Sequence, residues 1–146
     1  MGTDHRQLGV DLFNSTWELM DKTDRTPDED ALMIHMAHAS AYHWLQIGAP
    51  ENAARSHWQC SRMYTVLGRP EPAIYHAKLV LDVCERNDIG DWDLAFAYEA
   101  LARAYAVAGN SAESARWLTK ARAASADITD DEDRDLLLKD LSTIPA

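Results

Sequence analysis

The chain contains little cysteine and no long apolar run. Its two cysteines, Cys60 and Cys84, lie in apolar helical patterns and form no CxxC pair. This usage predicts buried, reduced thiols in a cytoplasmic protein, because secreted domains of this size normally carry paired cysteines. No stretch reaches the roughly 18 to 20 apolar residues of a membrane span, and the polar N-terminus lacks the apolar segment of a signal peptide. We therefore expect neither membrane insertion nor secretion.

Basic residues are also scarce, with 14 Lys and Arg against 24 Asp and Glu and a net charge of −10. Residues 1–30 carry 8 acidic and 3 basic side chains (net −5), and residues 127–146 carry 7 and 2 (also −5). Residues 31–126 are balanced, with nine of each sign. A chain without a basic face is poorly suited to bind phosphates, so we expect neither nucleic acid nor an acidic membrane surface as a partner.

No run of alternating Val, Ile or Thr predicts a strand, whereas apolar residues recur with helical spacing throughout the chain. Thr26, Pro27 and Glu29 predict a helix start with a capping box. Asp91 is expected to cap a later helix, and Thr129 is expected to open a second capping box. The sequence thus predicts one all-α domain over residues 1–146, with helices at about 5–22, 27–47, 50–67, 70–86, 92–108, 111–126 and 130–141.

One helix-to-helix turn occurs three times along the chain. An apolar residue is followed by Gly48, Gly68 or Gly109, and the next helix opens two residues later. Glycine adopts the left-handed backbone that ends a helix at little cost. A turn that recurs in this way indicates a helical repeat. We divide the domain into an N-terminal helix pair (5–47), two repeat-like pairs (50–86 and 91–126) and a C-terminal capping helix (130–142).

The last of these pairs resembles a tetratricopeptide repeat (TPR). The residues that carry the resemblance are Tyr98, Leu101, Ala102 and Tyr105, the turn residue Gly109, and Ser114, Leu118 and Ala121 in the second helix. Residues 50–86 are similar to a weaker copy, although the turn glycines lie 41 residues apart where the family has about 34. The resemblance implies a right-handed α-solenoid of antiparallel helix pairs. It also implies a concave groove, built by the first helix of each pair, in which a partner lies.

The resemblance places six residues in that groove. Arg62 and Arg103 take equivalent repeat positions, as do Arg55 and Phe96, and Trp58 and Glu99 lie beside them. Guanidinium groups suit carboxylates, and a tryptophan can anchor a partner. The leading hypothesis is therefore a non-catalytic module that binds a protein or peptide and recognises a carboxylate of that partner. We expect no cofactor, and a homodimer is one expected assembly. The alternative for the arginines is local pairing with acids on a solvated face.

The histidines carry a second hypothesis. His38, His43, His57 and His76 could line a pocket with tryptophan and arginine between the second, third and fourth helices, in a small-molecule or metal-binding protein or an enzyme. His43 lies about 140° around the helix from His38, so these two cannot hold one ion with His35. Zinc needs three or four converging ligands, and no HExxH motif supplies them. We therefore predict no metal site and no catalytic group, and expect the histidines to form hydrogen bonds between helices.

Overall fold

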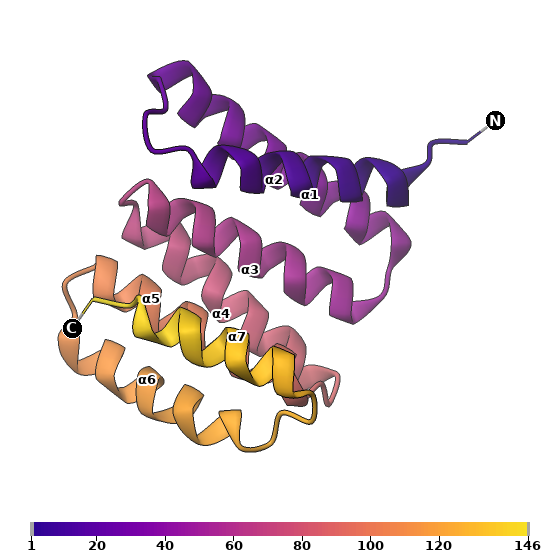
Figure 1. Cartoon of the computed structure of the whole chain (residues 1–146). Helices are drawn as coiled ribbons and strands as arrows, with labels where there is room; N and C mark the ends of the chain where they lie inside the picture. The colour runs from indigo at the N-terminus through magenta and orange to yellow at the C-terminus, as the bar shows by residue number, and fades with distance from the viewer. Residues whose placement is uncertain (1, 146) are drawn as a thin grey trace.

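The computed structural model describes residues 2–145 and contains seven helices within that range (Figure 1). They are α1 (His5–Asp21), α2 (Pro27–Ile47), α3 (Pro50–Val66), α4 (Pro70–Arg86), α5 (Asp91–Val107), α6 (Ser111–Ser125) and α7 (Asp131–Ser142). No strand occurs over the same residues. The all-helical class and the seven helices are confirmed, and each predicted end lies within one residue of the observed one. Over residues 2–145, none of the helices combines the length and apolar character that crossing a bilayer requires.

The sequence signals at the helix ends were largely right. Thr26 and Glu29 form the reciprocal capping box at the start of α2. The turn glycines Gly48, Gly68 and Gly109 have φ of +87°, +68° and +76°, so each holds the left-handed conformation for which glycine is suited.

Two helix starts were predicted wrongly by one residue. Gly90, not Asp91, precedes α5 as its N-cap, and Asp130, not Thr129, caps α7 by accepting from the backbone N–H of Asp133. Asp91 and Thr129 do not cap these helices because their side chains bond each other instead. Thr129 donates its Oγ1–H to the Asp91 carboxylate at 2.8 Å. This bond joins the starts of α5 and α7.

Helices that follow one another in sequence pack together, and α1 also contacts α3, α3 contacts α5, and α5 contacts α7. In Figure 1, α1 and α2 lie at one end, α3 and α4 in the middle, and α5, α6 and α7 at the other end. Helix α5 is the most buried element, with ten of its residues shielded from solvent. Small residues allow this close packing, because Ala95, Ala97, Ala102 and Ala104 are fully buried.

Buried hydroxyl groups tie the helices of each pair to one another. Ser40 donates to the carbonyl oxygen of Gly9, Ser61 to that of Ala73, and Ser114 to that of Ala102, each at 2.8 Å. Gly9 lies so near Trp44 that an added Cβ would stand 2.9 Å from the indole Nε1. The α1–α2 contact therefore leaves no room beside Trp44 for a side chain at position 9.

Candidate functional site

The buried carboxylate of Glu99 organises the residues predicted to line a groove. Glu99 is 1% exposed, and its Oε1 accepts from Trp58 Nε1 at 2.9 Å. Its Oε2 accepts from Arg103 Nε at 2.8 Å and lies 3.6 Å from Arg62 Nη1. Phe96 and Arg103, like Glu99, are buried. The structure thus brings predicted residues of α3 and α5 together, and three of the predicted six, Phe96, Glu99 and Arg103, are buried.

Helix α7 completes the polar cluster, by which we mean Arg62, Glu99 and Arg103 with their partners. Sequence reasoning did not foresee the part of α7. Arg103 Nη2 donates to the carbonyl oxygen of Asp140 at 2.9 Å and to Thr143 Oγ1 at 2.8 Å. The Asp140 carboxylate lies 3.7 Å from Arg62 Nη1. Burial, partly offset by Glu99, lowers the pKa of Arg62 from its usual value. Two carboxylates therefore balance the two arginines inside the protein.

Aromatic side chains form a row across α1, α3 and α5, which we call the aromatic row. Its members are Trp17, Trp58, Phe96 and Trp92. The ring centroids of Trp17 and Trp58 are 5.7 Å apart, those of Trp58 and Phe96 5.8 Å, and those of Phe96 and Trp92 6.2 Å. The three tryptophans are half-buried, whereas Phe96 is buried. Sequence reasoning missed Trp17 and Trp92, because no spacing signals that residues so far apart in the chain will meet.

Arg55 is the most accessible arginine of the predicted set. Its guanidinium stacks over Trp92, 4.4 Å from the ring centroid. Its Nε and Nη2 donate to the two carboxylate oxygens of Asp93, each at 3.2 Å. The Arg55 side chain is 42% exposed, whereas that of Asp93 is 9% exposed. Burial raises the pKa of Asp93, and Arg55 opposes that rise.

Three of the four predicted pocket histidines converge between α2, α3 and α4. His38 Nε2 is 2.8 Å from the hydroxyl of Tyr64, and His57 Nδ1 is 3.2 Å from His76 Nδ1. The rings of His38 and His76 have centroids 5.3 Å apart. The fourth, His43, lies elsewhere, with its Nδ1 2.9 Å from Nδ1 of His5.

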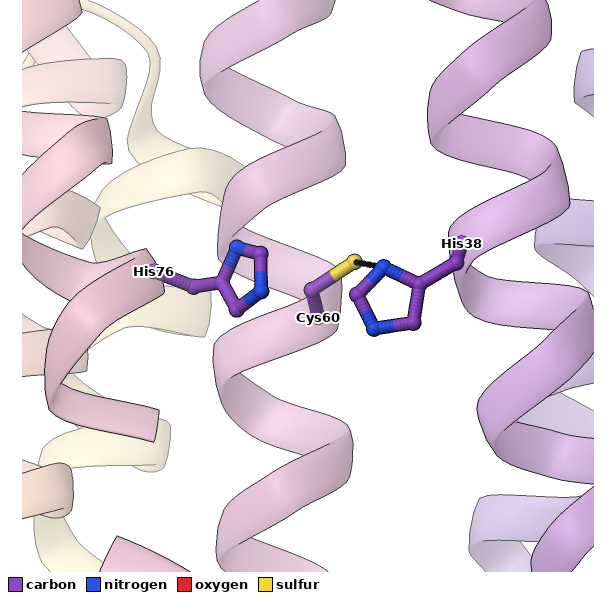
Figure 2. Close-up of side chains that lie close together, drawn as sticks. All are labelled: His38, Cys60 and His76. Carbon is purple, nitrogen blue, oxygen red and sulfur yellow. Dashed lines mark hydrogen bonds between the residues drawn. The ribbon is translucent and has the colours of Figure 1, made fainter. Parts of the chain in front are cut away.

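A cysteine joins the converging histidines. Cys60 is fully buried, and its Sγ lies 3.9 Å from Nδ1 of His38. Figure 2 shows the thiol between His38 and His76, one from each flanking helix. One ligand atom from each of these three residues lies within 4.8 Å of the other two. Sequence reasoning treated Cys60 only as a buried thiol, since its position relative to the histidines depends on helix packing.

Burial sets the charge state of the three histidines and of Cys60. It lowers the pKa of His76 to about 4, with the neighbouring His57 and His38 adding to the effect. It lowers the pKa of His38 and His57 as well, and raises that of Cys60 to about 12. At neutral pH the site holds neutral imidazoles and a protonated thiol.

Comparison of the chain with known protein families, with curated proteins and with solved structures finds no match.

Proposed function

We propose that the chain is a TPR-like, right-handed α-solenoid of antiparallel helix pairs that binds a peptide segment of a partner protein in the cytoplasm and catalyses no reaction. The pattern of helix contacts supports this architecture. Helices α1, α3, α5 and α7 contact one another in series, and α2, α4 and α6 each contact the helix before and the helix after. Two layers of this kind are what stacked helix pairs produce.

The aromatic row is the observation that carries the proposed function. It runs across three successive helices of one layer, and its three tryptophans remain half-buried rather than sealed in the core. Tryptophan and arginine are enriched among the residues that dominate binding energy at interfaces. A row of this kind suits an apolar side chain of a partner segment.

Arg55 defines the polar part of the partner. Its Nε and Nη2 are directed at Asp93, which leaves Nη1 for a ligand at the exposed end of the row. Arg62 and Arg103 are less suited to contact a partner, because both are largely buried and lie against Glu99. We therefore propose a segment with one apolar anchor on the aromatic row and one carboxylate, from a side chain or a chain end, at Arg55.

The test is selection of peptides from a displayed random library against the whole chain, followed by affinity measurements with Arg55→Gln. Glutamine removes the positive charge and keeps an amide N–H donor. We expect selected peptides to carry an acidic group and an apolar residue. Arg55→Gln should weaken their binding about 5- to 30-fold, or roughly 1–2 kcal/mol, a significant loss for one interface residue that stays below hot-spot size.

Arg86→Gln is the matched control. Arg86 also pairs with an aspartate, Asp82, but it lies on α4 and is 65% exposed. Its substitution is expected to leave the affinity unchanged. Selection of no peptide, or of peptides that are insensitive to Arg55→Gln, would contradict the proposed function.

A further inference from the structure

We infer that His38, Cys60 and His76 form a binding site for one transition-metal ion of the zinc class, between α2, α3 and α4. The three residues come from three successive helices and converge on one point (Figure 2). Two imidazoles and one thiolate suit zinc and its neighbours rather than magnesium or calcium, which prefer oxygen ligands. The sequence alone predicted no such site, because His35, His38 and His43 cannot hold one ion together and no HExxH or CxxC motif is present.

The spacing of the ligand atoms is close to that of a bound ion. With Zn–N bonds of about 2.0–2.1 Å and a Zn–S bond of about 2.3 Å, a tetrahedral ion holds its ligand atoms about 3.4–3.6 Å apart. Cys60 Sγ and His38 Nδ1 are already 3.9 Å apart, and the whole set lies within 4.8 Å. Closing the set around an ion requires the ligand atoms to approach one another by at most about 1.4 Å.

Both histidines have their second ring nitrogen occupied, which fixes the nitrogen that faces Cys60. His38 can donate from Nε2 to the Tyr64 hydroxyl, which leaves the lone pair of Nδ1 directed at the thiol. His76 can donate from Nδ1 to Nδ1 of His57, which leaves Nε2 on the side of the ring that faces Cys60 (Figure 2). Partners of this kind orient the histidine ligands of metal sites and set their tautomers.

The binding step balances without any redox change. The S–H bond of Cys60 breaks, a sulfur–metal bond forms, and the proton passes to solvent. Both imidazoles bind through lone pairs and release no proton. Three protein ligands leave one tetrahedral position for a water molecule, an arrangement that zinc accepts.

The test is titration of the metal-free chain with Zn²⁺, read by calorimetry, and with Co²⁺, read by absorption. We expect one ion per chain and a thiolate-to-cobalt charge-transfer band in the wild-type protein. Cys60→Ser and His76→Gln should each weaken Zn²⁺ binding by more than about 100-fold, and Tyr64→Phe by about 10- to 100-fold, as expected for a partner of a ligand.

Two matched controls separate this site from adventitious binding. Cys84→Ser removes the other buried cysteine, and His43→Gln removes a histidine outside the cluster. Both should bind Zn²⁺ as the wild type does. The inference is overturned if the wild type shows no cobalt–thiolate band, or if Cys60→Ser and His76→Gln bind Zn²⁺ normally. The wild-type cobalt spectrum tests thiolate ligation even if one of the variants does not fold.

Discussion

Replacing Glu99 by glutamine tests how strongly the buried polar cluster stabilises the fold. Glutamine keeps the size of the side chain and an oxygen that can accept from Trp58 Nε1, but it carries no charge. Arg103, which is 8% exposed, then loses the carboxylate 2.8 Å from its Nε, and Arg62 keeps only Asp140 at 3.7 Å. The variant therefore leaves an excess of positive charge inside the protein.

The expected loss follows from the cost of an uncompensated buried charge. Breaking a buried ion pair by removing one partner costs roughly 3–5 kcal/mol. Because Asp140 and the Trp58 hydrogen bond remain, we expect the lower end, about 3 kcal/mol. That is a large share of the roughly 5–15 kcal/mol that stabilises a typical domain. It corresponds to a melting temperature lower by about 10 °C for a chain of this size.

The assay is urea unfolding followed by far-UV circular dichroism, with the free energy of unfolding obtained by linear extrapolation. Glu113→Gln is the control, because Glu113 also accepts from a tryptophan, Trp117, and from an arginine, Arg116, but at the surface. It should cost less than about 0.5 kcal/mol, as exposed pairs do. Equal losses below about 1 kcal/mol for both variants would refute the reasoning.

Three further predictions concern the helix contacts, the caps and the metal. Gly9→Ala should lower the free energy of unfolding by about 1–3 kcal/mol in the same assay, because its Cβ meets Trp44, whereas Gly2→Ala, which lies outside the helices and has open space around it, should lower it far less. Thr26→Ala should cost about 1 kcal/mol through the lost capping box, and a neutral result would show that the cap is not needed. Zinc affinity should rise about tenfold per pH unit between about pH 6 and 8, since binding displaces one proton from a thiol whose pKa is about 12, and a flat profile by calorimetry would exclude thiolate ligation.

Local signals were enough to predict the helices. Glycine after an apolar residue, proline at a helix start and the Thr26–Glu29 box each act within a few residues, so the chain itself carries that information. The misplaced starts at Asp91 and Thr129 arose because these two residues bond each other across 38 positions. A rule for helix caps considers one helix start at a time and cannot include such a partner.

The candidate sites depended on packing and were only partly predictable. The resemblance to a repeat family placed Arg62, Glu99 and Arg103 along one groove, but nothing in their spacing indicated that α7 would bring Asp140 to them. In the same way, the angular positions of residues around α2 separated His43 from His38. They could not show that Cys60 would lie between His38 and His76. Distances between helices are set by which side chains fit together, which a single sequence does not reveal.

The central position of α5 determines which helices can unfold locally. Helix α5 contacts α3, α4, α6 and α7, and its buried residues hold both the polar cluster and part of the aromatic row. Helix α1, by contrast, contacts only α2 and α3 among the described elements. Partial unfolding can therefore begin at α1 and leave the rest intact, whereas exchange of the α5 amide hydrogens requires disruption of most of the fold. The slowest hydrogen exchange should therefore lie in α5. Helix α1 should unfold far more often than the part of the fold that buries the Glu99 carboxylate.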